Sequence, residues 1–239
     1  MGAMDWNTYD AALFDLDGVL TPTAEVHMRA WAEMFNAFLT DRGIDGPYTD
    51  QDYFTYVDGK PRYEGVQSFL DSRGIDLPYG DPGDPTDAET VCGLGNRKND
   101  AFNAVLERDG IEPYPGSVKL LDHLAGLGTK MAVVSSSKNA RNVLAVAGLA
   151  DRFEVIVDGA VAASEGLPGK PKPDTFLAAA RRVGTDAARS VVLEDAVSGV
   201  QAGRAGSFGL VVGVDRGAGR QALLDGGADV VVADLEELV

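Results

Sequence analysis

The chain has little cysteine, no long hydrophobic run and no leader-like beginning. Its 239 residues include one cysteine, Cys92, which excludes an internal disulfide and a cysteine-rich metal site. No apolar stretch approaches the roughly 20 residues that span a bilayer. Residues Met1–Tyr9 lack the basic and apolar parts of a signal peptide. We therefore expect a cytoplasmic protein with no membrane partner.

Basic residues are also scarce, with 21 Lys and Arg against 37 Asp and Glu and a net charge of −16. A surface this acidic repels nucleic acids, so we expect no nucleic-acid partner. A phosphate substrate would need a few basic side chains at special positions. Hydrophobic residues make up 45% of the chain, which is enough for a well-buried core. For the oligomeric state, our default expectation is a monomer.

Short apolar runs alternate with helical segments through most of the chain. The runs that predict strands are 11–16, 131–134, 155–157, 191–193, 210–214 and 230–232. The segments with helical patterns are 118–127, 139–147, 175–183 and 197–205. This alternation predicts an α/β fold with a Rossmann-like parallel sheet and helices on both faces.

The stretch between residues 22 and 114 has a different pattern, without strands. Ala24–Leu39 carries apolar residues at helical spacing, and 63–72 and 96–108 also read as helices. We expect residues 1–21 and 115–239 to form the α/β core, with a helical cap domain of residues 22–114 inserted after the first strand. Ile75–Gly95 is rich in Pro, Asp and Gly, which predicts an exposed loop.

Polar residues follow several of the predicted strands. In an open parallel sheet, ligands bind beyond the carboxyl ends of the strands. Asp15 and Asp17 follow the first strand, Ser135–Asn139 follows the second, and Glu194 and Asp195 end the fourth. Together with Lys170, which precedes a helix, these residues predict four carboxylates and an ammonium at one edge of the sheet.

Clustered carboxylates repel one another and are tolerated around a hard cation such as Mg²⁺. The predicted cofactor is therefore Mg²⁺, which neutralises and orients a phosphate. Serine hydroxyls at a helix N-terminus suit the same phosphate, as does Lys170. Of Asp15 and Asp17, one carboxylate can attack phosphorus while the other moves a proton. Each motif alone is common in turns and loops, so the prediction depends on their combination and order.

The same motifs resemble those of a known superfamily. Phe14–Leu20, Ser135, Lys170-Pro171 and Leu193–Asp195 are similar to the four motifs of haloacid-dehalogenase-like phosphotransferases, whose cap also follows the first motif. The resemblance implies that Asp15 is the nucleophile, that Asp17 is the general acid and base, and that Ser135 and Lys170 hold the phosphate. It implies Mg²⁺ ligands from Asp15, the Asp17 carbonyl and Asp195, with Glu194 beside them or ligating.

Further stretches resemble the β-phosphoglucomutase family: Thr23–Trp31, Asp58–Arg62, Asn96–Asn99 and Ser135–Asn139. This resemblance implies interconversion of β-D-glucose 1-phosphate and glucose 6-phosphate through an aspartyl phosphate and glucose 1,6-bisphosphate. It implies that His27 couples cap closure to Asp17. The residues that it implies for phosphate or sugar binding are Gly59, Arg62, Lys98, Ser135, Ser136, Ser137, Lys138, Asn139, Lys170 and Trp31. From the pattern alone, Trp31 is a core residue and His27 is as readily structural.

Two other functions remain open. A sugar-phosphate phosphatase would use the same core residues, whereas a mutase must hold a second phosphate, for which Arg62 and Lys98 supply cations in an acidic chain. A non-catalytic binding protein fits less well, because Asp15 and Asp17 are both present. Departures from the mutase pattern at Pro22, at Pro61 and in the long segment 75–95 leave the cap geometry and the sugar open.

Overall fold

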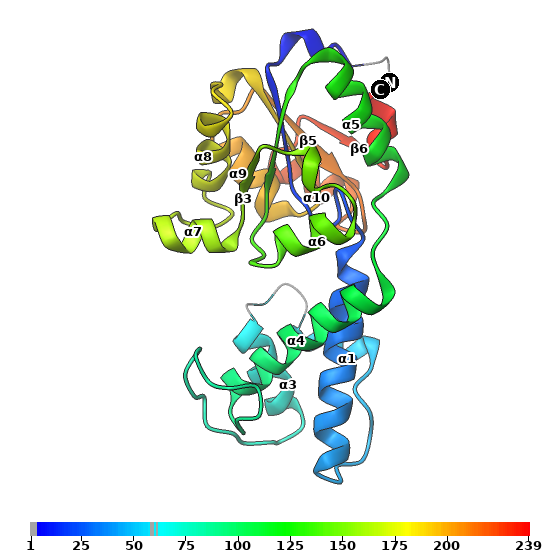
Figure 1. Cartoon of the computed structure of the whole chain (residues 1–239), viewed down its shortest axis with the longest axis vertical. Coiled ribbons are helices and arrows are strands. Elements are labelled where there is room, and N and C mark those ends of the chain that lie inside the picture. Colours follow the sequence, from blue (N-terminus) through cyan, green and yellow to red (C-terminus); the bar gives the residue numbers. More distant parts are fainter. Residues whose placement is uncertain (1–3, 58–59, 61) are drawn as a thin grey trace. The chain divides into compact units, whose positions relative to one another are not determined.

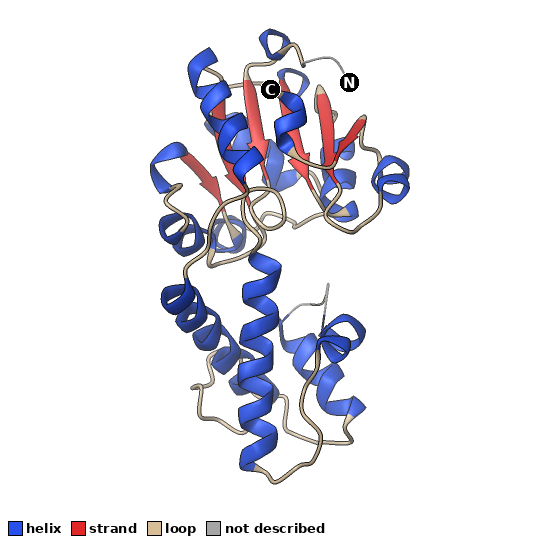
Figure 2. Ribbon diagram, turned by 90° about the vertical axis from the view of Figure 1, so that its right-hand side faces the viewer, coloured by secondary structure: helices blue, strands red, loops and turns tan. Residues whose placement is uncertain are grey.

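The computed structural model describes residues 4–57, 60 and 62–239. The chain forms two compact units, one of Met1–Thr23 with Ile111–Val239 and one of Ala24–Gly110. Each unit has its own cluster of buried hydrophobic side chains. The first unit holds the sheet, and the described part of the second unit is helical (Figure 2).

The sheet has six parallel strands in the order β3-β2-β1-β4-β5-β6. The strands are β1 (Ala11–Phe14), β2 (Lys130–Val134), β3 (Val155–Val157), β4 (Ser190–Glu194), β5 (Leu210–Val214) and β6 (Val230–Val232). Strand β1 lies between β2 and β4, and its last residue, Phe14, is in register with Val133 and Leu193. The segments that follow these three strands therefore begin side by side, where ligands bind in sheets of this kind.

Helices cover both faces of the sheet, which confirms the predicted fold class. The helices of this unit are α5 (Pro115–Leu127), α6 (Ala140–Val146), α7 (Gly159–Glu165), α8 (Asp174–Arg182), α9 (Val197–Ala205) and α10 (Arg220–Gly226). Side chains of α8, α9 and α10 pack on Leu13, Ala132 and Val192 in one cluster. Helix α5 lies on the other side of the sheet from α8 (Figure 1). Short 3₁₀ turns span Trp6–Thr8, Ala150–Arg152, Ala187–Arg189 and Leu235–Leu238.

The second unit is built around stacked aromatic side chains. Its elements are α1 (Thr23–Asp41), α2 (Asp50–Asp52), a π-helical turn at Tyr53–Val57, α3 (Arg62–Ser72) and α4 (Val91–Asp109). The Phe35 ring centroid lies 5.3 Å from that of Trp31 and 4.1 Å from that of Phe69. These rings fill the space between α1 and α3.

The prediction of a loop over Ile75–Gly95 is wrong at its C-terminal end, because α4 begins at Val91. The Thr90 hydroxyl caps this helix by accepting from the Gly93 N–H at 2.9 Å, and Val91 is fully buried. The part before Thr90 is a loop, and side chains of α4 bind its main chain. Asn96 donates to the carbonyls of Pro82 and Asp84, and Arg97 donates to that of Thr86.

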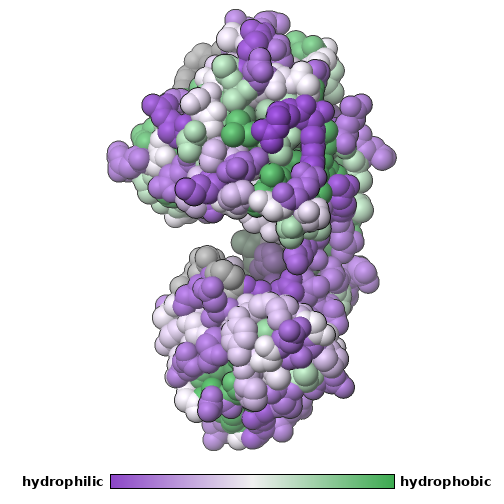
Figure 3. All heavy atoms as spheres, turned by 90° about the vertical axis from the view of Figure 1, so that its left-hand side faces the viewer, coloured by the Kyte–Doolittle hydropathy of each residue, from purple (hydrophilic) through white to green (hydrophobic). Residues whose placement is uncertain are grey.

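Hydrophilic residues cover most of the face of each unit seen in Figure 3, in keeping with the acidic composition. Within the described residues, none of the helices has both the length and the apolar character that a membrane crossing requires.

Candidate active site

A buried cluster of carboxylates surrounds Lys170 at the carboxyl edge of the sheet. Asp15 directly follows β1, and Glu194 is the last residue of β4. As whole residues they are 6% and 1% exposed. The Lys170 ammonium contacts a carboxylate oxygen of both residues and donates to the Val134 carbonyl at 3.3 Å. Asp195 completes the cluster, since one oxygen each of Asp15, Glu194 and Asp195 lies within 4.8 Å of the others.

The charges in this cluster shift one another's protonation. Burial raises the pKa of Asp15 well above its ordinary value, while the Lys170 ammonium acts in the opposite direction. Burial and the neighbouring Glu194 carboxylate raise the pKa of Asp195 to about 7. Burial alone would lower the pKa of Lys170, but Asp15 and Glu194 outweigh it and hold that pKa above the usual range. The three carboxylates of Asp15, Glu194 and Asp195 carry more negative charge than the single Lys170 ammonium balances. Such a set of oxygen donors fits Mg²⁺.

Asp17 lies beside the loop that follows β2. The Ser135 hydroxyl is 3.3 Å from Asp17 Oδ2 and accepts from the Ser137 N–H at 3.1 Å. In the described part of the chain, Asp17 Oδ1 is buried without a hydrogen-bond partner. Burial raises the pKa of Asp17, so this carboxyl group holds a proton more readily than an exposed aspartate. Such a group is suited to exchange protons with a reacting oxygen.

Two glycines make room for the carboxylates. Gly18 has a φ of +79°, and a Cβ there would lie 1.9 Å from Asp195 Oδ2. A Cβ on Gly199, near the start of α9, would lie 1.7 Å from Glu194 Oε1. Sequence reasoning gave neither glycine a role, although both stand inside the motifs. The structure shows that the positions of Glu194 and Asp195 require them.

The remaining residues of the second motif line the connection from β2 to α6. Ser136 and Lys138 are exposed, and Ser137 and Asn139 are partly buried. The Asn139 N–H donates to the Ser137 hydroxyl at 3.1 Å. These four predicted residues thus adjoin Ser135 at the same edge of the sheet as Asp15, where their polar groups are accessible to a ligand.

In the second unit, three of the predicted residues form one group. Lys98 Nζ lies 2.6 Å from His27 Nδ1 and 5.0 Å from the centroid of the Trp31 ring. The His27 ring stacks on Phe102 with centroids 4.4 Å apart. Burial lowers the pKa of His27 well below its ordinary value, and the charges of Lys98 and Arg62 act in the same direction. A neutral His27 ring would accept a hydrogen bond from the Lys98 ammonium through Nδ1. Trp31 lies in the core, as its helical pattern indicates.

Arg62 begins α3, and its Nη2 donates to Asn99 Oδ1 on α4 at 2.9 Å. Sequence reasoning missed this partner. Helices α1, α3 and α4 thus supply the predicted cations and histidine of this unit. Gly59, the remaining predicted residue, lies outside the described residues.

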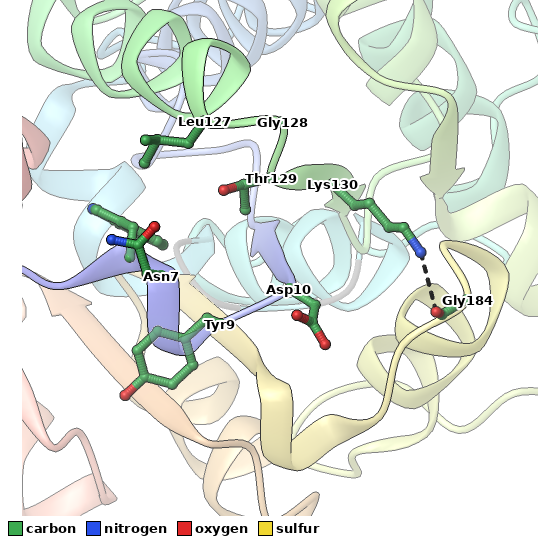
Figure 4. Close-up of a pocket in the computed structure, with 9 residues that line it drawn as sticks. Asn7, Tyr9, Asp10, Leu127, Gly128, Thr129, Lys130 and Gly184 are labelled. Carbon is green, nitrogen blue, oxygen red and sulfur yellow. Dashed lines mark hydrogen bonds between the residues drawn. The ribbon is translucent and has the colours of Figure 1, made fainter.

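A cavity of about 370 Å³ lies at the opposite edge of the sheet (Figure 4). Its lining consists of Trp6, Asn7, Tyr9, Asp10, Leu127, Gly128, Thr129, Lys130 and Gly184. The carboxylate in this lining, Asp10, is bound by the Arg189 guanidinium at 2.6 and 2.7 Å. Lys130 donates to the Gly184 carbonyl at 3.1 Å. These charged groups are paired within the protein, so the carboxyl edge remains the candidate active site.

Comparison with known proteins agrees with the motifs. The family model for haloacid dehalogenase-like hydrolases matches residues 9–206. The chain belongs to this family. Among its relatives, β-phosphoglucomutases of Mycobacterium bovis and Mycobacterium tuberculosis are 52% identical, over 96% of this chain and 91% of theirs. The β-phosphoglucomutase of Bacillus subtilis is 36% identical, over 95% of this chain and 91% of its own.

Solved structures of the same family share the fold. A β-phosphoglucomutase from Clostridium difficile is 27% identical, with a TM-score of 0.72 over 97% of this chain and 93% of its own. CbbY from Rhodobacter sphaeroides, in complex with phosphate, is 26% identical, with a TM-score of 0.73 over 96% of each chain. The predicted superfamily and the resemblance to β-phosphoglucomutases are thus confirmed.

Proposed function

We propose that this chain is a β-phosphoglucomutase that interconverts β-D-glucose 1-phosphate and glucose 6-phosphate. The observation that carries the proposal is 52% identity to curated β-phosphoglucomutases over nearly the full length of both chains. The carboxylate–lysine cluster supplies the chemistry that such an enzyme needs. A small sugar-phosphate substrate also fits the basic side chains Lys170, Arg62 and Lys98, which are among the predicted site residues.

In this proposal the Asp15 carboxylate is the nucleophile. It attacks the phosphorus of a sugar phosphate, and the bond from phosphorus to the sugar oxygen breaks with its electron pair on that oxygen. The reverse step returns the phosphoryl group to a sugar hydroxyl. Phosphorylated Asp15 converts β-D-glucose 1-phosphate to glucose 1,6-bisphosphate, and Asp15 then takes the phosphoryl group at C1 to release glucose 6-phosphate. Added glucose 1,6-bisphosphate would therefore prime the enzyme.

Asp17 is the proton carrier of both half-reactions. It gives a proton to the sugar oxygen that leaves phosphorus and takes one from the hydroxyl that attacks. The raised pKa of Asp17 supports this role. Ser135, whose hydroxyl lies beside Asp17, and Lys170 would hold the transferring phosphoryl oxygens.

Asp15, Asp195 and the main chain of Asp17 would hold Mg²⁺, with Glu194 next to them. When bound, the ion neutralises negative charge on the phosphate and fixes its orientation. Lys170 contacts Asp15 and Glu194. Its ammonium would therefore supply a second positive charge, from the protein itself, beside the bound phosphate. The ammonium would also keep the nucleophile oriented between phosphoryl transfers.

The helical unit would serve as the cap that binds the sugar and its second phosphate. Arg62 offers a planar set of N–H donors, which suits bidentate binding of phosphate. Lys98, held against His27, would bind the sugar, and His27 would link cap closure to proton transfer at Asp17. Ser136, Ser137, Lys138 and Asn139 would complete the binding site from the core. A phosphatase needs only one phosphate site, and this second set of cations therefore favours a mutase.

The test is phosphorus NMR of the protein with β-D-glucose 1-phosphate, Mg²⁺ and a trace of glucose 1,6-bisphosphate. We expect glucose 6-phosphate with little inorganic phosphate. Inorganic phosphate as the main product would contradict the proposal and indicate a sugar-phosphate phosphatase. The R62M variant separates the two functions further. We expect it to lose mutase turnover while retaining Mg²⁺ binding, whereas a phosphatase, which needs only one phosphate site, would keep its turnover.

A further inference from the structure

The loop that carries Asp17 is held by donors from distant parts of the chain. Three consecutive carbonyls of this loop each accept a hydrogen bond. Those of Val19 and Leu20 accept from residues at the start of α5, namely the Ser117 hydroxyl at 2.6 Å and the Tyr114 N–H at 2.9 Å. The Gly18 carbonyl accepts from Arg216 Nε at 3.1 Å, across 198 positions of sequence.

Arg216 itself makes three further contacts and is partly buried. Its Nη1 donates to the Ala233 carbonyl at 3.2 Å, and its Nη2 lies 3.4 Å from an Asp234 carboxylate oxygen. The guanidinium carbon lies 3.8 Å from the centroid of the Tyr114 ring. A guanidinium held by three acceptors and an aromatic face has one orientation. The Gly18 carbonyl therefore accepts from a donor whose own position is restrained.

Gly18 in turn contacts the carboxylate cluster. Its N–H donates to the Thr21 carbonyl at 2.8 Å, so the residue is restrained on both sides. A Cβ at this position would overlap Asp195 Oδ2, which means that the Asp195 carboxylate packs directly against the Gly18 main chain. The peptide bond before Gly18 also carries the Asp17 carbonyl, a proposed Mg²⁺ ligand. A shift of Gly18 would therefore move two groups of the metal site together.

We propose that Arg216 is a positioning residue for the Mg²⁺ site, acting through the Gly18 carbonyl. This inference rests on the proposed function for the identity of the ion. Within the described residues, Arg216 contacts Gly18, Ala233, Asp234 and Tyr114, and none of these side chains is a proposed Mg²⁺ ligand. Its action requires the geometry of the guanidinium and not its charge alone, because an ammonium cannot reach three acceptors while stacking on Tyr114.

The test is calorimetric titration of the full chain with MgCl₂, without sugar, at a temperature where every variant is folded. We expect R216A to weaken Mg²⁺ binding by about tenfold, the lower end of the effect of groups that orient metal ligands. We expect R216K not to restore it. Y114F should bind Mg²⁺ like the wild type, and Y114L should bind it more weakly, since it loses the aromatic face.

The matched control is R189A, which removes an arginine paired with Asp10 at the opposite edge of the same sheet. It should leave Mg²⁺ affinity unchanged even where it lowers the unfolding midpoint. Wild-type affinity in R216A, or full recovery in R216K, would overturn the inference. If R216A does not fold, R216K and Y114L carry the test. Because no sugar is present, a wild type that binds Mg²⁺ but does not convert β-D-glucose 1-phosphate would contradict the proposed function alone.

Discussion

The Lys170 ammonium contacts the carboxylates of both Asp15 and Glu194. Its side chain is 9% exposed, as is that of Asp15, and that of Glu194 is 1% exposed. Two buried carboxylates without a counter-charge would be strongly unfavourable. Lys170 therefore allows the proposed nucleophile to lie in a site from which water is largely excluded.

Replacing Lys170 with Met should affect both activity and stability. Without the ammonium, Asp15 and Glu194 face each other unpaired, and breaking a buried pair of this kind costs about 3–5 kcal/mol. We expect this loss in denaturant unfolding measured with EDTA, and a partial recovery with Mg²⁺. We expect kcat to fall by at least about a hundredfold, the usual effect of removing one group that stabilises charge in the transition state.

Lys172 provides the control for this experiment, because it lies two residues away and is exposed. The K172M variant should keep the activity of the wild type and change the free energy of unfolding by less than about 0.5 kcal/mol. A K170M protein as stable as K172M in EDTA would contradict the role assigned to Lys170.

Changing Asp15 to Asn should abolish turnover without unfolding the protein. Burial raises the pKa of Asp15, and Lys170 keeps Glu194 as its charged partner, so a neutral amide suits this position. We expect far-UV circular dichroism and the unfolding midpoint to match the wild type, and phosphorus NMR to detect no sugar conversion. D10N, at the opposite edge of the sheet, should remain active. Turnover in D15N above about 1% of wild type would rule out Asp15 as the nucleophile, since loss of a catalytic nucleophile costs far more than a hundredfold.

The carboxylate cluster could be located from the sequence, because its position depends only on the order and register of the strands. The segments after β1, β2 and β4 meet at one edge whatever the details of the helices, and the observed register of Phe14 with Val133 and Leu193 brings Asp15 next to Glu194. The contact of Arg216 with Gly18 depends on a side chain that lies 198 residues away. No local pattern signals such a contact.

The start of α4 was missed for a different reason. Gly93 and Gly95 resemble helix breakers in the sequence, yet both lie inside the helix. A Cβ on Gly93 would lie 2.4 Å from the Ala88 carbonyl oxygen, and one on Gly95 would lie 2.6 Å from the Tyr63 ring. These glycines allow the preceding loop and α3 to pack closely on α4. Tertiary packing therefore outweighs their low helix propensity.

Two glycine-to-alanine substitutions in helices test whether Glu194 needs the space that Gly199 leaves. They separate this effect from the general effect of removing a glycine from a helix. In G199A the new Cβ would overlap Glu194 Oε1, whereas at Gly126 in α5 a Cβ meets nothing within 4 Å. We expect G199A to displace Glu194 and to weaken Mg²⁺ binding by about tenfold or more. We expect G126A to leave Mg²⁺ binding unchanged and to stabilise the protein by up to about 1 kcal/mol. Equal Mg²⁺ affinity in the two variants would show that Glu194 does not depend on Gly199.

The last prediction concerns the pH dependence of the helical unit. Burial and the charges of Lys98 and Arg62 hold the pKa of His27 well below its ordinary value, while in the unfolded chain it returns to about 6.5. Below that pH the unfolded state binds a proton that the folded state excludes, so acid favours unfolding. The stability of this unit should fall by up to about 1.4 kcal/mol per pH unit between pH 6.5 and 5.5.

The control is H27Q, which has no titrating ring and should show a smaller slope over the same range. The fluorescence of Trp31, measured in a W6F background, would follow the unfolding of this unit, since Trp6 and Trp31 are the two tryptophans of the chain. Parallel slopes for the two proteins would mean that His27 is protonated alike in the folded and unfolded states, which would contradict its proposed neutral state beside Lys98.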